Sequence, residues 1–487
     1  MNKKEEIEIV NIPVSRYETK NMLCEIVWRK KKMQWCCYNH KKHTCTFKDS
    51  IDKEDIDEDG KIKIFRYIPD PFLYPFIVEK KIFLPEMPEN YGSEEELTKE
   101  IIEYIRKYVD YPEKFLKIDP FFVRMTWIYE KFESVPYRVA YSPFHQYGVG
   151  KSRWAFVVGA ISYRGYVLGS NATSAVIFRL THSIRGVPII DESEFNLKTE
   201  AGQALMQILN GGYSKSTGAV IRCEGKSNTP TLYVSYAPKL IAARQYFPDE
   251  STNSRALFHH ARKTKRKIPE QLPPEFYEES KKLRNKLLYW KFKHYKKNYN
   301  LNEIDLRDEI ENSRIREIIL PLYIIADNEG RRYLIEMGKS KEKEEMSKKQ
   351  DTDEATIIRA FYSLFNENPE RKGISLGQLR ERAIELDGSF SKSPRKIGDI
   401  LRRAFEIETK KMYIKELNSN PFAIELNKEN LKKFQEAAEA YCIEPEDVQP
   451  QIEVEAEEAE EMDICKEKEI DAPPELIEKL IDTDESE

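Results

Sequence analysis

The stretch that decides the fold reads His145-Gln146-Tyr147-Gly148-Val149-Gly150-Lys151-Ser152. It follows an apolar run typical of a strand, residues 137–141, and opens a segment with helical patterning, residues 153–162. Backbone N–H groups of a glycine-bearing turn at a helix N-terminus point at phosphate oxygens. Lys151 would neutralise the β and γ phosphates, and Ser152 would offer its hydroxyl to Mg²⁺. The segment therefore predicts a nucleotide site, with His145 where G-x-x-x-x-G-K-[ST] usually has its first glycine.

A second motif follows this segment along the chain. Residues 186–190 have the pattern of a short buried strand, and the strand ends in Asp191 and Glu192. A carboxylate at the C-terminal end of a sheet strand lies at the ligand crevice of an open α/β fold. We expect Asp191 to hold Mg²⁺ and Glu192 to be the general base for an attacking water.

Composition and charge bound the class of protein. The chain has 487 residues, 40% of them hydrophobic, which excludes a wholly disordered protein. No apolar run is long enough for a transmembrane helix, and residues 1–10 lack a secretory h-region, so we expect a cytoplasmic protein without membrane contact. Residues 444–487 hold 19 Asp and Glu against 3 Lys, which leaves the rest of the chain basic. A basic body with an acidic tail is typical of proteins that handle nucleic acid, although an ordinary enzyme with a solvated tail has the same balance.

The patterning predicts a multidomain α/β protein. We expect a β-rich N-terminal domain (1–92), an α/β ATPase core (93–262), a basic helical extension (263–338) and a charged linker (339–352). Further on we expect a winged helix-turn-helix (353–418), one more helix (419–443) and an acidic disordered tail (444–487). Residues 94–117 read as one amphipathic helix that starts at the cap Ser93, with Glu96 completing a capping box.

Four cysteines and two histidines crowd together in the N-terminal segment. Thiolates and imidazoles are the ligands that Zn²⁺ prefers, but the spacing matches no standard zinc template. The sequence leaves open a zinc site or a β-rich segment with free cysteines. The candidate ligands are Cys24, Cys36, Cys37, His40, His43 and Cys45.

Taken together, residues 119–262 resemble the ATPase core of AAA+ proteins, closest to superfamily 3 helicases and their archaeal, phage and plasmid replication relatives. Residues 238–243 resemble the strand that carries a polar sensor residue, commonly Asn, although this chain has Arg244 there. Residues 247–255 resemble the segment whose arginine reaches the γ-phosphate of a neighbouring subunit. The resemblance implies that Arg255 is an arginine finger in a ring-shaped homo-oligomer, expected to be a hexamer. An arginine paired with a surface carboxylate would leave the same sequence.

Several segments are candidates for DNA contact. Superfamily 3 helicases insert a hairpin after the acidic pair and grip DNA with a lysine at its tip, which by position is Lys226 in the predicted hairpin 218–234. Lys215 is a second candidate, and an ordinary surface hairpin fits the same pattern. Residues 262–297 combine basic with aromatic side chains, which suits either base stacking or an amphipathic helix with an aromatic core face. The third helix of the winged-helix segment would present Arg395, Lys396, Arg402 and Arg403 to single- or double-stranded DNA, unless the segment mediates protein contacts.

The function predicted from these features is an ATP- and Mg²⁺-dependent DNA helicase or translocase. It would hydrolyse ATP as a ring and serve replication of a mobile element, a virus or an archaeal or bacterial genome. The alternative is a nucleotide-gated DNA-binding initiator, regulator or defence ATPase without unwinding activity. A third reading is an ATPase that remodels proteins, because a fold does not fix a function.

Overall fold

The computed structural model describes residues 8–56, 62–142, 148–169, 172–191, 198–224, 229–263 and 265–444. The chain forms two compact units, Met1–Glu342 and Lys343–Glu487. Predicted boundaries at residues 92 and 262 therefore do not separate compact units, because the N-terminal strands share their core with the central sheet. Among the described helices, none combines the length and the apolar character that crossing a membrane requires.

The N-terminal part is rich in β structure, as predicted. Strands β1 (Glu8–Val14), β7 (Ile62–Pro69) and β6 (Ile51–Ile56) form one sheet in that order. An antiparallel sheet is formed by β2 (Arg16–Thr19), β3 (Met22–Arg29), β4 (Lys32–Asn39) and β5 (Thr44–Lys48). Both central strands of the second sheet are buried, so apolar side chains pack on its two faces.

The central sheet of unit 1 has five parallel strands in the order β14-β8-β13-β10-β9. Its strands are β8 (Tyr137–Tyr141), β9 (Tyr166–Leu168), β10 (Pro188–Asp191), β13 (Leu240–Ala242) and β14 (Ala256–His260). Strands β8 and β13 consist entirely of buried residues, which is expected of a parallel sheet covered on both faces. The predicted α/β sheet is thus confirmed at this coarse level.

Helices and one hairpin complete the first part of unit 1. The helices are α1 (Tyr74–Val78), α2 (Glu94–Tyr108), α3 (Glu113–Leu116), α4 (Asp119–Trp127), α5 (Lys151–Gly159), α6 (Ser174–Ile184), α7 (Glu200–Gly211) and α8 (Glu250–Ser254). The capping box of Ser93 and Glu96 is present, as predicted. One helix over 94–117 was expected, but α2 ends at Tyr108, because Pro112 cannot continue it and restricts the residue before it.

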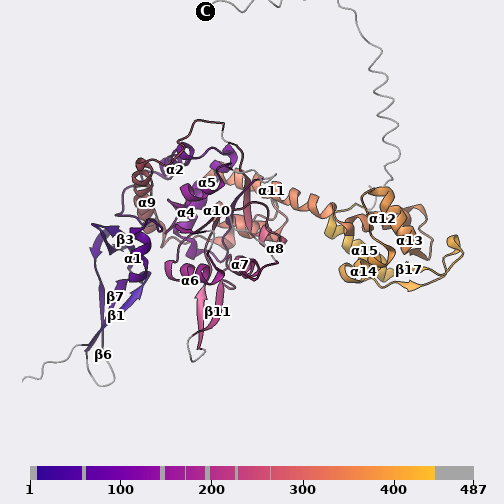
Figure 1. The fold of residues 1–487 in the computed structure, drawn as a ribbon, viewed down its shortest axis with the longest axis horizontal. Coiled ribbons are helices and arrows are strands. Elements are labelled where there is room, and N and C mark those ends of the chain that lie inside the picture. The colour runs from indigo at the N-terminus through magenta and orange to yellow at the C-terminus, as the bar shows by residue number, and fades with distance from the viewer. Residues whose placement is uncertain are drawn as a thin grey trace, which may run out of the picture. The chain divides into compact units, whose positions relative to one another are not determined.

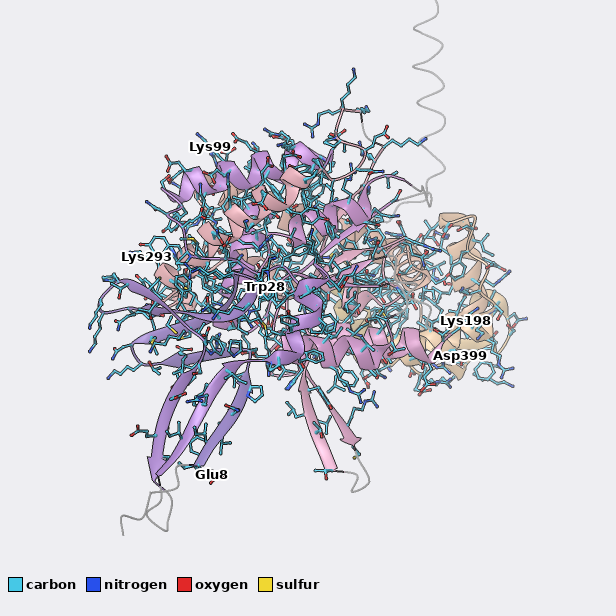
Figure 2. The ribbon with its side chains drawn as sticks, turned by 60° about the vertical axis from the view of Figure 1, so that its left-hand side comes forward. Glu8, Trp28, Lys99, Lys198, Lys293 and Asp399 are labelled. Carbon is cyan, nitrogen blue, oxygen red and sulfur yellow. The ribbon has the colours of Figure 1, made fainter. Side chains whose placement is uncertain are left out.

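Strands β11 (Ala219–Glu224) and β12 (Thr229–Val234) form the predicted antiparallel hairpin. In two views the hairpin projects from unit 1 in the same direction as β6 and β7 (Figures 1 and 2). The side chains of Ile221 and Leu232, a directly opposed pair, are 66% and 53% exposed. The hairpin therefore stands largely in solvent.

The basic extension packs into unit 1. It contains α9 (Pro274–His294), α10 (Ser313–Tyr323) and the long α11 (Asn328–Gln350). Phe276, Trp290 and Phe292 of α9 are buried in the main core. These three rings therefore belong to the aromatic core face of an amphipathic helix and are not available to stack on bases. Most of the expected linker 339–352 is helical, because α11 runs through it as far as Gln350.

Unit 2 begins within α11 and has its own core. It contains α12 (Asp353–Glu367), β15 (Gly373–Ser375), α13 (Leu376–Leu386), α14 (Pro394–Ala404), β16 (Lys410–Lys411), β17 (Phe422–Glu425) and α15 (Lys428–Tyr441). The strands form an antiparallel sheet in the order β15-β17-β16. Strand β17 lies beyond the expected boundary at 418, and Phe434 of α15 stacks on Phe361 of α12 with ring centroids 3.5 Å apart. The fold of unit 2 therefore extends through α15, and the acidic tail after Glu444 lies outside the described residues.

Candidate functional site

The turn before α5 has the backbone that its glycines predict. Gly148 and Gly150 adopt φ values of +70° and +83°, in the left-handed region that favours glycine. Apart from the chain neighbours of each glycine, no described residue has an atom within 4 Å of a Cβ placed at either position. Val149 between them is buried, while His145, Gln146 and Tyr147 lie outside the described residues. The described part of the turn therefore offers backbone without side-chain obstruction at the start of a helix.

Lys151 is the first residue of α5 and is only 8% exposed, with Ser152 half-buried beside it. Helix α5 packs across β8, β13 and β10. Its far end approaches β10 so closely that a Cβ on Gly159 would lie 2.3 Å from Ile189 Cδ1. These contacts fix the direction in which the N-terminus of α5 points.

Asp191 ends β10 at the same edge of the sheet. Strand β13 lies between β8 and β10, and Ala242 pairs with both Ala140 and Asp191. The carboxyl ends of parallel strands meet at one edge, so Asp191 and the turn that follows β8 lie at the same edge, two strands apart. Within the described ranges, the buried Oδ1 of Asp191 accepts no hydrogen bond. Glu192 lies outside the described residues.

A buried polar cluster contacts α5 through Trp154. Arg138 of β8 forms an ion pair of 2.6 Å with Asp119 of α4, and both side chains are fully buried. The indole Nε1 of Trp154 donates to the other carboxylate oxygen of Asp119 at 2.9 Å. His259 packs against the Trp154 indole with ring centroids 4.3 Å apart, and burial, aided by the charge of Arg138, lowers the pKa of His259 well below its ordinary value. Sequence reasoning missed this cluster, because its members are far apart in the chain and form no local motif.

Arg255 lies directly after α8 and is held by other residues of the same chain. Its guanidinium donates to Asn210 Oδ1 at 2.8 Å and lies 4.5 Å from the centroid of the Tyr213 ring. Asn210 in turn donates to Asp249 at 2.9 Å and accepts from Thr252 at 2.6 Å. Arg255 is half-buried, and its guanidinium is held by the Asn210 amide, the Ser251 hydroxyl and the Tyr213 ring.

Of the two lysines predicted to contact DNA near the hairpin, Lys226 lies outside the described residues. Lys215 is exposed, and its ammonium donates to the backbone oxygen of Glu130 at 2.6 Å. The base of the hairpin holds another lysine, which sequence reasoning missed. Lys239 is fully buried and donates to the backbone oxygens of Gly212, Ser235 and Ala237 at 2.9–3.2 Å. Burial lowers the pKa of Lys239 to about 7.

Helix α14 of unit 2 separates its apolar and basic residues. Ile397 and Leu401 are buried, as their spacing predicts. The other face is exposed, and Asp399, labelled in Figure 2, pairs with one of its arginines at 2.7 Å. The exposed basic residues are Arg395, Lys396, Arg402 and Arg403.

The structure does not bring the candidate zinc ligands together. Adjacent residues of a strand point to opposite faces, so Cys36 lies in one core while Cys37 lies in the other with its cross-strand partner Cys24. Cys45 packs at the edge of the core that contains Cys36, and His43 bonds to the Tyr38 hydroxyl at 3.1 Å. His40 packs edge-on against the Tyr38 ring. Within the described residues, no group of three or more His, Cys, Asp or Glu is arranged to hold a metal ion.

Comparison with known proteins adds little. No protein-family model matches the chain, and no curated protein matches it. Two solved structures described as the A form apo structure of the NrS-1 C-terminal region share 13% identity with it, at TM-scores of 0.36 and 0.35. The first alignment covers 84% of this chain and 97% of that chain, and the second covers 83% and 96%. TM-scores this low do not establish a common fold, so the similarity carries no argument about function.

Proposed function

We propose that unit 1 contains a P-loop ATPase core of the AAA+ type, and that the chain is an ATP-driven DNA helicase or translocase that works as a ring, with six subunits as the expected number. One observation carries the proposal. Lys151 opens a helix directly after a turn with two left-handed glycines, at the same sheet edge as Asp191. A helix N-terminus with an adjacent lysine at the carboxyl edge of a parallel sheet suits a triphosphate.

The residues present fit a nucleotide with Mg²⁺. Among the described residues, no side chain blocks the approach of phosphate oxygens to the backbone at Gly148 and Gly150. The unpartnered Oδ1 of Asp191 suits a cation or its bound water, and Ser152 would supply a hydroxyl. When bound, Mg²⁺ supplies positive charge that stabilises the phosphates during transfer.

The chain's own groups have separate tasks in this proposal. Lys151 neutralises charge on the β and γ phosphates, and backbone N–H groups of the turn and of α5 orient them. Glu192, adjacent to Asp191, accepts a proton from the attacking water. Arg255 of a neighbouring subunit supplies the cation that phosphoryl transfer requires, after leaving Asn210 and Tyr213.

Three features support DNA as the partner. The β11–β12 hairpin projects from unit 1 (Figure 1), and Lys226 falls in the sequence between its two strands. Helix α14 exposes four cations on one face. Three helices and a three-stranded antiparallel sheet in unit 2 support a winged-helix assignment, in which α14 would be the recognition helix.

The first experiment tests the nucleotide site. Lys151→Ala removes the phosphate counter-charge, so ATP affinity measured by calorimetry should fall below detection. Lys99→Ala, at an exposed lysine of α2 (Figure 2), is the matched control and should bind ATP like the wild type. Unchanged affinity in Lys151→Ala would refute the site.

The second experiment separates a motor from a DNA-binding switch. Wild-type protein with ATP is mixed with a forked duplex, and strand displacement and ATP turnover are recorded together. The proposal expects DNA to stimulate turnover and one strand to be displaced, with neither effect in Lys151→Ala. DNA-stimulated turnover without displacement would favour the nucleotide-gated initiator, regulator or defence ATPase instead.

A further inference from the structure

Three large apolar side chains of unit 2 remain exposed in the segment that runs from β16 to the first residue of β17. Tyr413 is 56% exposed, Leu417 44% and Phe422 52%. Neighbouring apolar residues of the same segment, Ile414 and Ala423, are buried in the core of the unit. We call residues 410–422 the aromatic turn. Its two aromatic rings are exposed to solvent, although neighbouring side chains are buried in the core of unit 2.

The aromatic turn is held by its own hydrogen bonds. Ile414 N donates to Ser419 O at 2.9 Å, and Met412 N donates to Pro421 O at 3.2 Å. The hydroxyl of Tyr413 donates to Asn418 Oδ1 at 2.8 Å. Asn418 takes a left-handed conformation, which asparagine tolerates better than most residues. A ring presented on such a turn loses little entropy when it binds a partner.

The aromatic turn has a net positive charge. Lys411 pairs across the sheet with Phe422, and its ammonium lies 5.7 Å from the centroid of the Phe422 ring. Residues 410–422 hold three Lys against one Glu, and Lys410 pairs with Glu425 of β17 at 2.6 Å. Over the whole of unit 2 before the acidic tail, by contrast, the two signs balance. The excess of positive charge therefore coincides with the rings.

Exposed rings beside cations match the chemistry of a single-stranded nucleic acid. Aromatic side chains stack on unpaired bases, while lysine and arginine contact phosphates. A duplex offers phosphates but keeps its base faces stacked within the helix, so it would contact the lysine and arginine side chains but not the aromatic rings. An apolar protein surface would contact the rings but would form no ion pairs with the cations.

We propose that the aromatic turn binds the unpaired bases of single-stranded DNA, with Tyr413 and Phe422 as stacking residues and Lys411 as a phosphate contact. Unit 2 then binds a duplex that carries a single-stranded tail better than the same duplex with blunt ends. This inference deepens the proposed function, because it assigns unit 2 the unpaired part of the DNA.

The test uses the full-length Lys151→Ala chain without nucleotide. Its affinity for labelled oligo(dT) is measured by fluorescence anisotropy, and stacking is measured by quenching of 2-aminopurine in the same strand. Tyr413→Ala and Phe422→Ala should each weaken binding about tenfold and reduce the quenching, since one stacked base is lost. Tyr413→Phe retains the ring and should keep both signals. Leu417→Ala is the matched control, because it removes an exposed apolar side chain that has no ring.

Each outcome decides a definite point. Unchanged affinity in both ring-to-alanine variants overturns the inference. An equal loss in Leu417→Ala and Tyr413→Ala also overturns it, since the turn would then be a general apolar contact such as a protein surface. Full-length protein that binds no DNA of any form overturns both the inference and the DNA-directed function. Failure of the ATPase proposal leaves these affinities unchanged, because the assay contains no nucleotide.

Discussion

Glu25 of β3 and Arg164, in the turn after α5, form an ion pair of 2.6 Å with both side chains only 2% exposed. Lys291 of α9 contacts the other carboxylate oxygen of Glu25 at 2.8 Å, and the Tyr163 hydroxyl donates to Glu25 at 2.8 Å. One carboxylate therefore joins the N-terminal sheet, the central α/β layer and the basic extension. This junction adds a buried polar link to the hydrophobic core that these parts of unit 1 share.

Replacing the buried carboxylate tests that junction. Glu25→Gln keeps the shape but leaves the buried Arg164 without its carboxylate partner and Lys291 with only Glu130, 3.4 Å away. We expect the free energy of unfolding to fall by about 3–5 kcal/mol, the usual cost of removing one partner from a buried pair. Urea unfolding followed by circular dichroism measures it. Asp49→Asn, which breaks the exposed pair with Lys32, is the matched control and should leave the unfolding midpoint unchanged.

The same carboxylate predicts a pH dependence. Burial alone would raise the pKa of Glu25, but Lys291, Arg164 and Arg16 overcome it and lower the pKa from 4.5 to about 2. Between these values the unfolded chain binds the proton and the folded chain does not, so stability falls as the pH decreases through this window. The stability difference between wild type and Glu25→Gln should therefore be constant above about 4.5 and shrink toward 2. A difference that stays constant down to pH 2 would contradict the assignment.

Lys239 predicts a dependence of the same sign in the neutral to alkaline range. Burial lowers its pKa from 10.5 to about 7, so between these values the unfolded chain holds a proton that the folded chain has lost. Stability should then rise with pH through this window, by at most about 1.4 kcal/mol per pH unit. Comparing unfolding of wild type and Lys239→Met across the window isolates this lysine from other titrating groups. Equal slopes would mean that the three backbone oxygens keep Lys239 protonated.

Local signals in the sequence predicted local structure well. The capping pair Ser93 and Glu96 marked the start of α2, and Gly150 before Lys151 marked the start of α5, because each depends on neighbours within a few residues. Cys36 and Cys37 are adjacent in β4 and cannot share a site, since adjacent strand residues face opposite ways.

Long-range pairs were not predictable in the same way. Nothing near Asp119 in the sequence indicates that Arg138 and Trp154 will bond to it, and Lys239 looks like any lysine before an apolar strand. Such partners are selected by tertiary packing, which buries a charge only where a distant segment supplies the compensating group. The end of α2 was also not predicted, because the amphipathic pattern continues past Pro112 while the helix ends before it.

The role proposed for Arg255 predicts complementation between two inactive variants. Arg255→Ala should bind ATP but turn it over slowly, because the neighbouring subunit loses its cation, whereas Glu192→Gln should bind ATP without hydrolysing it for want of a base. In a mixed ring, an intact Arg255 from a Glu192→Gln subunit meets an intact Glu192 in an Arg255→Ala subunit. ATP turnover should therefore reappear on mixing the two. Lys151→Ala also carries an intact Arg255, so it should restore turnover to Arg255→Ala but not to Glu192→Gln, whose own site lacks its base. Arg314→Ala serves as a comparison variant, because Arg314 also lies over the Tyr213 ring, 5.2 Å from its centroid, but has no assigned role in catalysis.

Slow turnover that mixing does not restore would contradict the proposed role. Arg255 would then act within its own subunit, as a structural residue held by Asn210 and Tyr213.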